Sequence, residues 1–319
     1  YLVANLREFR HEKQVGVVTD FQRGLYDGYA EFLRIGEGSL GGKGRGLAFV
    51  NNLVSRFPIH DAFEGVKISV PRSAVICTGF FDQFMELNDL TGFALEDHSD
   101  EEIIEVFSKA RIPRRLEKDL KSFLAFAKYP MAVRSSSLLE DCHYQPFAGI
   151  FDTHFLPNNH PSLKARLNRL IVAIKLIYAS VYFQNAKHYT EATGNRTEEE
   201  KMAVILQEIV GENRDGYFYP VLSGMARSYN FYSVGRIKPE EGIAYTALGL
   251  GKTIMEGENC LFFSPSNPQV LPQFATPQDF LRNTQREFFA VDMNDPTVYP
   301  ETGGEVGLVK LKTKQSEQH

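Results

Sequence analysis

Apolar positions recur along this chain with two periods, one typical of helices and one typical of strands. Spacing of three and four residues marks amphipathic helices after Ser99, after Pro113 and after Pro161. The stripe after Pro161 is the longest and predicts the longest helix. Its apolar members are Leu163, Leu167, Leu170, Ile171, Ile174, Tyr178 and Val181. A stripe of this kind is typical of a helix that packs on a core.

Local signals mark where several of these elements start. Ser99 and Glu102 have the spacing of a capping box, in which each side chain bonds the other residue's backbone N–H. Pro113 suits the first turn of a helix, where its missing N–H costs nothing. The charged segment 193–201 is predicted to be a loop at a junction between subdomains. Short apolar runs bounded by turn residues predict strands over residues 131–133, 203–210, 217–222, 243–247 and 261–264.

Both ends of the chain are polar. Residues 1–34 contain well-separated aromatic side chains and predict a helical N-terminal extension. Residues 310–319 predict a disordered tail. The predicted division therefore has three parts, which are the extension over 1–34, a first subdomain over 35–200 and a second subdomain over 201–319.

Composition narrows the class of protein. With 319 residues and 43% hydrophobic content, the chain is large enough to bury cores for two subdomains. Its formal net charge of -5 provides no basic field for nucleic acid or for an anionic membrane surface. No apolar run reaches the length of a membrane span, and Cys77, Cys142 and Cys260 show neither metal spacing nor a disulfide pattern. We therefore expect a cytoplasmic protein that binds neither nucleic acid nor membrane.

The first candidate for chemistry is the segment 131–153, in which Arg134 follows a short apolar run. Three serines, residues 135–137, come next and add hydroxyl and amide donors. The guanidinium of arginine offers a fixed fork of N–H donors that suits phosphate or carboxylate oxygens. Two interpretations remain open from the residues alone: a phosphate-binding arginine, and a structural ion pair of Arg134 with Glu140 or Asp141.

The second candidate is the segment 35–49, where six glycines surround Lys43 and Arg45. The residues that follow have helical apolar spacing, so the glycine-rich loop is predicted to open a helix whose free amides favour anions. The segment does not match the P-loop pattern, because Glu37 stands where a glycine is needed and Gly44 where Ser or Thr is needed. A flexible turn with a solvated lysine is the open alternative.

Together the two segments resemble the N-terminal nucleotide-binding domain of the pyruvate phosphate dikinase and phosphoenolpyruvate synthase family. The resemblance runs from about Ile35 to about Phe263, with the motifs in the family's order and at similar spacing. As they stand in this chain, the motifs are Gly41-Gly42-Lys43, Val70-Pro71-Arg72-Ser73-Ala74-Val75-Ile76, Val133-Arg134-Ser135-Ser136, Glu140-Asp141, Phe147-Ala148-Gly149, Leu206-Gln207-Glu208-Ile209-Val210 and Gly249-Leu250-Gly251 with Gly257. Val-Arg-Ser-Ser combined with Phe-Ala-Gly is the specific part of this set.

The resemblance implies an α+β fold of the ATP-grasp kind, with ATP between two subdomains. By their places in the motifs, Lys43 and Arg134 are expected to hold the phosphates of ATP. Their charges would offset the charge that spreads over the phosphoryl oxygens in the transition state. Ser135, Ser136 and Gly149 are expected to line the same cofactor site.

The resemblance also implies a phosphotransferase that uses ATP and Mg²⁺. In that family a phosphoryl group passes from ATP to a histidine on a separate swivelling domain, and from there to pyruvate. Gln207 is expected to lie near the adenine or the ribose. The implied partners are therefore ATP, the domain with the phospho-histidine, and pyruvate or a similar acceptor.

Departures from the family pattern leave a second interpretation open. Lys252 replaces the glutamate of the family's Gly-Leu-Gly-Glu segment, and no Asp-x-Glu pair that would bind magnesium follows Gly257. No metal ligand is therefore assigned. Because the phospho-histidine motif and a pyruvate-binding barrel are also missing, we expect a piece of a longer polypeptide, truncated at its C-terminus. The alternative function is a degenerate nucleotide-binding regulatory module without transferase activity.

Overall fold

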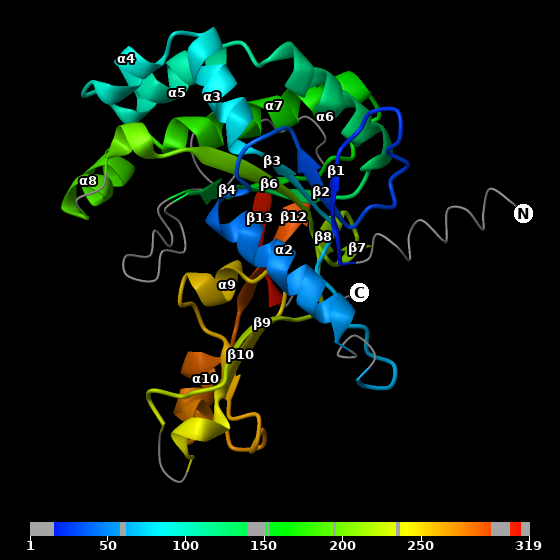
Figure 1. Ribbon diagram of the computed structural model, residues 1–319. Helices are drawn as coiled ribbons and strands as arrows, with labels where there is room; N and C mark the ends of the chain where they lie inside the picture. Colours follow the sequence, from blue (N-terminus) through cyan, green and yellow to red (C-terminus); the bar gives the residue numbers. More distant parts are fainter. Residues whose placement is uncertain are drawn as a thin grey trace, which may run out of the picture. The chain divides into compact units, whose positions relative to one another are not determined.

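The fold combines helices with three β-sheets, so the predicted α+β class is confirmed (Figure 1). The computed structural model describes residues 16–57, 62–138, 151, 153–193, 196–233, 237–294 and 307–313. By its internal contacts the chain divides into two units. The first unit contains residues 1–209 and 296–307, and the second contains residues 210–295 and 308–319.

A six-stranded sheet forms the centre of the first unit, with strand order β1-β2-β3-β6-β4-β5. Its strands are β1 (Val18–Asp20), β2 (Phe32–Ile35), β3 (Ser73–Ile76), β4 (Met131–Ser137), β5 (Thr153–Leu156) and β6 (Met202–Glu208). Strands β1, β2 and β3 are parallel, whereas β6 runs antiparallel to both β3 and β4. All but the last residue of β6 are buried, which fits its almost continuous apolar sequence.

Helices cover both faces of this sheet. Figure 1 shows α3, α5, α6 and α7 on one side and α2 on the other. The helices of this unit are α2 (Gly41–Arg56), α3 (Thr78–Leu87), α4 (Thr91–Leu95), α5 (Asp100–Lys109), α6 (Arg114–Phe126), α7 (Leu163–Ser180) and α8 (Gln184–Ala192), with a short 3₁₀ helix at Thr197–Glu199. The larger core lies between the sheet and the helices of the first face, where Phe84, Phe107 and Tyr178 are fully buried.

The predicted helix starts agree with the structure. Ser99 Oγ accepts the Glu102 N–H at 3.2 Å, and Glu102 Oε2 accepts the Ser99 N–H at 2.9 Å, which completes the capping box of α5. Pro113 directly precedes α6. Helix α7 begins at Leu163, two residues after Pro161, and its 18 residues make it the longest helix in the described part of the chain.

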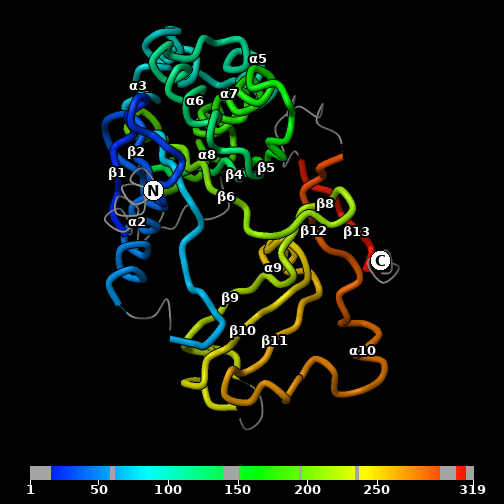
Figure 2. Tube along the Cα trace, turned by 90° about the vertical axis from the view of Figure 1, so that its right-hand side faces the viewer, coloured from blue at the N-terminus to red at the C-terminus, as the bar shows by residue number. Residues whose placement is uncertain are grey.

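The second unit contains two smaller sheets (Figure 2). The three-stranded sheet has the order β11-β10-β9, and the four-stranded sheet has the order β13-β12-β8-β7. The strands are β7 (Glu212–Arg214), β8 (Tyr217–Tyr219), β9 (Ser223–Arg227), β10 (Ile243–Ala247), β11 (Leu261–Phe263), β12 (Glu287–Asp292) and β13 (Leu308–Lys312). Helices α9 (Lys252–Met255) and α10 (Pro277–Asn283) and 3₁₀ turns at Pro239–Glu241 and Pro272–Phe274 complete the unit. Its small core contains Tyr219, Phe288 and Ala290.

The polar N-terminal segment differs from the prediction. In its described part, residues 16–34, the chain forms strands β1 and β2 and the turns between them instead of a helical extension. The reason is tertiary packing, because Phe32 and Leu33 are buried in β2 and the Tyr26 ring packs against Phe123 and Phe126 of α6. Residues 1–15 lie outside the described residues.

Two further differences concern long-range strand pairing. The units divide after Ile209 rather than at residue 200, because β6 pairs with β3 and β4 of the first unit. The described start of the predicted disordered tail is ordered, since β13 pairs with β12 from Leu308 to Lys312. None of the helices among the described residues combines the length and the apolar character that crossing a membrane requires.

Candidate functional site

The glycine-rich segment opens a helix, as predicted. Helix α2 begins at Gly41, and Lys43 is its third residue. Gly41 has φ +71°, and a Cβ atom there would lie 1.9 Å from the backbone carbonyl oxygen of Ser136. Glycine is therefore needed at this position, because the start of α2 approaches the end of β4 too closely for any side chain.

Buried serine hydroxyls join the start of α2 to the end of β4. Ser136 Oγ accepts the backbone N–H of Gly44 at 2.9 Å and donates to the carbonyl of Leu40 at 2.8 Å. Lys43 Nζ donates to Ser135 Oγ at 3.3 Å. Ser135 and Ser136 are almost completely buried, at 1% and 0% exposure. These bonds hold the lysine at a defined place over the end of the strand.

Arg134 lies on the face of the sheet that α2 covers. It pairs across β4 and β6 with Ile205, and Ile205 packs in a small core cluster with Val75 and with Leu47 of α2. Because residues opposite each other in neighbouring strands point to the same face, Arg134 and Ile205 share this side of the sheet. Alternation along β4 places Ser136 there as well.

A chain of hydrogen bonds crosses three strands on this face. Arg134 donates to Gln207 Oε1 at 3.0 Å, and Gln207 Nε2 donates to Ser73 Oγ at 3.3 Å. Ser73 Oγ in turn donates to the carbonyl of Pro71 at 2.9 Å. Gln207 and Ser73 are buried, whereas Arg134 is partly exposed. This arrangement fixes the position of the Arg134 guanidinium against the neighbouring strands.

The charges around this helix start favour an anion. The first turn of α2 contains no acidic residue, and the partly exposed Lys43 lies within it. A cation at this end opposes the helix dipole, whose positive pole is at the N-terminus. Local rules of this kind are commonly broken at functional sites, where a bound anion would compensate both charges.

The structure thus places Ser136, Arg134 and Gln207 on the α2 side of the first unit's sheet, and Lys43 bonds Ser135 beside Arg134. Their roles toward a nucleotide stay predictions. Gly149, together with the rest of Phe147-Ala148-Gly149, lies outside the described residues. So do Glu140 and Asp141, the partners in the alternative ion pair of Arg134.

Sequence reasoning did not single out Ser73 as a site residue. It comes directly after Arg72 in the Val-Pro segment, and its hydroxyl is what positions the Gln207 amide. Arg72 itself pairs with Glu208 through two hydrogen bonds of 2.7 and 2.8 Å. The Val-Pro motif indicated this strand. The contact between Ser73 and Gln207, however, depends on the pairing of β3 with β6, which the motif does not show.

The remaining charged groups of interest are possible metal ligands and Lys252. Among the residues that the structure describes, no group of three His, Cys, Asp or Glu side chains is arranged to hold a metal ion. Lys252, in the second unit, pairs with Glu256 at 3.1 Å and lies 5.1 Å from the ring centre of Phe289.

Comparison with known proteins identifies one family. The model of the family described as the pyruvate phosphate dikinase AMP/ATP-binding domain matches residues 37–279. The matched range includes Lys43, Arg134 and Gln207 and covers well over half of the chain. A search of the curated proteins found no match.

Proposed function

Since the chain belongs to the family of the pyruvate phosphate dikinase AMP/ATP-binding domain, we propose that Lys43 and Arg134 hold the phosphates of a bound ATP. Membership makes it the ATP-binding part of an enzyme of this kind, with an ATP-grasp-like fold. The observation that carries the assignment is that Lys43, at a helix start without acidic residues, bonds Ser135, the residue next to Arg134 in β4.

Each residue is given a distinct part in binding. Lys43 acts as a point charge, and the fork of Arg134 contacts two phosphate oxygens at once. Ser135 and Ser136 set the place of α2 against β4 and so aim the helix amides at the phosphates. Gln207 lies next to Arg134 and is assigned to the adenine or ribose. Gly149 is assigned to the same cofactor site.

The proposed reaction is the one that the family resemblance implies. A phosphorus–oxygen bond of ATP breaks while a bond from phosphorus to a histidine nitrogen of a separate domain forms, and the phosphoryl group then passes to pyruvate or a similar acceptor. Lys43 and Arg134 would stabilise the charge on the transferring group. Magnesium, if it binds, would supply further positive charge to the phosphates, and no described residue is assigned to hold it.

The alternative is a regulatory module that binds nucleotide without transferring phosphate. Lys252 favours this alternative, because a cation stands where the family has a glutamate. In the structure the Lys252 ammonium is held locally by Glu256, so it has a structural partner of its own. With the domain that bears the phospho-histidine present, phosphoryl transfer to that histidine supports the first function, and nucleotide binding without transfer supports the second.

Titration calorimetry with ATP tests the binding site. We expect Lys43→Gln and Arg134→Lys each to weaken ATP binding by about 1–2 kcal/mol, which is roughly five- to thirtyfold. Arg45→Gln is the matched control, because Arg45 lies on the same helix and is exposed. It loses the same charge and should bind ATP like the unchanged protein.

A melting curve without ligand separates binding from a structural role of Arg134. If Arg134 grips phosphate, Arg134→Lys keeps the melting temperature and loses affinity, since lysine keeps the charge but not the fork. A lowered melting temperature with unchanged ATP affinity would show that Arg134 instead forms a structural ion pair. Sustained magnesium-dependent ATP turnover by this chain alone would show that metal ligands exist outside the described residues.

A further inference from the structure

The first unit contains a cavity of about 910 Å³ that the ATP assignment does not use. Residues of α3, of the loop between α5 and α6, of α6 and of α7 line it. All these elements lie on the helical side of the six-stranded sheet, opposite α2 (Figure 1). The volume falls within the range of about 300–1,000 Å³ that is usual for small-molecule sites.

The lining of this cavity is positively charged. The lining contains four cationic side chains, Arg111, Arg114, Arg115 and Lys175, and two carboxylates, Glu86 and Glu117, which gives a formal balance of +2. The chain as a whole carries -5. Cations are therefore concentrated here against the general charge of the protein, which raises the local concentration of anions.

Two of the arginines in this lining have no carboxylate partner among the described residues. In the described part of the chain, neither Arg111 nor Arg114 forms an ion pair. Arg115 differs, since its guanidinium lies 3.7 Å from the Glu37 carboxylate and 4.0 Å from that of Asp119. Arginines without a carboxylate partner can offer their whole N–H fork to an anion.

Helix α6 also begins at this cavity. Pro113 and Arg114 form part of the lining, and no side chain caps the helix start. The first amides of an α-helix have no partner within the helix, and its dipole adds partial positive charge at this end. This start adds to an anion site that the cationic side chains already define.

The fourth cation comes from the opposite wall. Lys175 of α7 is partly buried, and its ammonium donates to the carbonyl of Ser108 at 2.8 Å. Burial lowers the pKa of Lys175, because the surroundings disfavour its charged form. An ammonium has three N–H donors, so the bond to Ser108 leaves capacity for a second acceptor.

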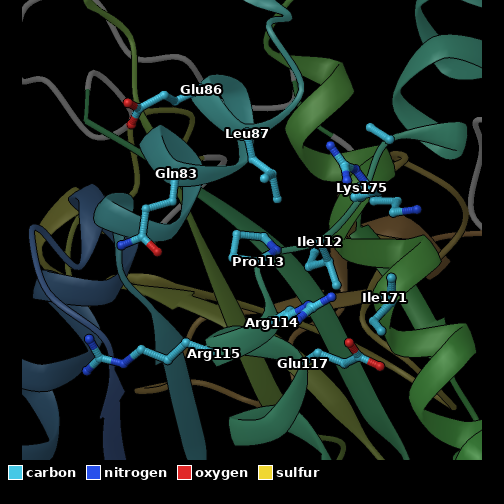
Figure 3. A pocket seen from close by; sticks show the side chains of 12 residues that line it. Gln83, Glu86, Leu87, Ile112, Pro113, Arg114, Arg115, Glu117, Ile171 and Lys175 are labelled. Carbon is cyan, nitrogen blue, oxygen red and sulfur yellow. The ribbon is translucent and has the colours of Figure 1, made fainter.

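The floor of the cavity is apolar. Figure 3 shows Leu87, Ile112 and Pro113 near its centre, with Lys175 and Arg114 on one side and Gln83 and Arg115 on the other. Ile171 adds apolar surface one helical turn before Lys175. A ligand that fits this surface has an anionic group at one end and an apolar part at the other.

From this combination we propose that the cavity is a second ligand site, which binds a small organic phosphate. Its phosphate lies among Arg111, Arg114 and Lys175, and its apolar part lies on Leu87, Ile112 and Ile171. The site is separate from the ATP phosphates, because the six-stranded sheet stands between these residues and α2. It takes an anion with an apolar group in preference to inorganic phosphate.

Phenyl phosphate is the probe for the first experiment, with the full chain in a calorimetric titration. We expect binding that weakens at least tenfold in Arg114→Gln and in Lys175→Gln. Lys118→Gln is the matched control, because Lys118 is an exposed lysine of α6 outside the cavity lining, and it should bind the probe normally. Unchanged binding in both cavity variants would overturn the proposal.

Melting curves without ligand show whether the cavity variants still fold. Arg114 is exposed, so Arg114→Gln is expected to fold and melt like the unchanged protein. Inorganic phosphate should bind more weakly than phenyl phosphate, and equal binding of the two would refute the role of the apolar floor. Binding should survive saturating ATP and the Lys43→Gln substitution. Loss of the probe in either case would place it at the α2 face and overturn the second site.

Discussion

Two glycines of the same helix should respond in opposite directions to the same substitution. Gly41 starts α2 with φ +71°, and a Cβ there would lie 1.9 Å from the Ser136 carbonyl oxygen. Gly46 lies one turn later, is exposed, and a Cβ there would meet no atom within 4 Å. Alanine at these two positions therefore adds one methyl group in two different environments.

For Gly41→Ala the cost has two parts. The left-handed backbone costs an L-residue about 1–2 kcal/mol, and the clash adds an overpacking cost of about 1–3 kcal/mol. Relief of the clash requires the distance to grow from 1.9 Å to the 3.4 Å of ordinary contact, a shift of about 1.5 Å. The Ser136 backbone cannot supply that shift easily, because β4 pairs with β6 at this position.

For Gly46→Ala the expected change is a gain of about 0.5–1 kcal/mol, since glycine in a helix interior is less favourable than alanine. Thermal unfolding followed by circular dichroism measures both changes. With about 2–4 °C per kcal/mol, Gly41→Ala should melt at least about 4 °C lower, and Gly46→Ala about 1–4 °C higher. Gly41→Ala should also lose ATP affinity, because the start of α2 moves away from the Ser136 hydroxyl.

Three results with these glycine variants would contradict the reasoning about α2. If Gly41→Ala melts like the unchanged protein, the close approach of α2 to β4 is wrong. If Gly46→Ala destabilises as much as Gly41→Ala, the difference between their environments is wrong. Normal ATP affinity in a destabilised Gly41→Ala would separate the helix start from phosphate binding.

Three further predictions concern burial and strand order. Burial raises the pKa of the Cys77 thiol to about 11, so iodoacetamide at pH 9 should label Cys77 only after denaturation, as peptide mapping can check. Burial lowers the pKa of Lys175, so the unfolded chain binds more protons at this group just below pH 10.5 and its contribution to stability rises with pH there; in urea unfolding curves the stability of Lys175→Met relative to the unchanged protein should therefore fall as pH rises through this range. A chain ended after Glu200 lacks β6 and should give no cooperative melting transition, whereas native melting would contradict the strand order.

Elements that local residues specify could be predicted from the sequence. The capping box of Ser99 and Glu102, the start of α6 after Pro113 and the strand over 243–247 depend on neighbours in the chain. Each signal lies within a few residues of its effect, so tertiary packing had little to change.

Elements that distant residues specify could not. The aromatic spacing of residues 16–34 suits a helix, yet Tyr26 packs on α6 and Phe32 on the sheet. Lys310 and Lys312 read as a polar tail, although they belong to an edge strand, where lysines are usual. The strand over 203–210 was predicted, but its pairing with β3 and β4 was not. Without that pairing, the boundary between the subdomains was predicted at residue 200.

The candidate site also combines features that nearby residues specify with features that distant residues specify. Motif similarity was enough to predict that Lys43 opens a helix and that Arg134 belongs with it. The hydrogen bonds from Arg134 to Gln207 and from Gln207 to Ser73 require the register of three strands. Sequence spacing contains no information about that register.

The central place of β6 has a consequence for the synthesis of the protein. Strands β3 and β4 both pair with β6, so neither can complete its hydrogen bonds until residue 208 has left the ribosome. Between Ile76 and Met202 the ribosome adds roughly 125 residues, which takes about 6–25 seconds at about 5–20 residues per second. During this interval the nascent chain exposes the unpaired edges of two strands, which is the kind of surface that chaperones bind and that promotes aggregation. Synonymous codon changes that slow translation between these positions should therefore reduce the yield of folded protein without altering a single residue.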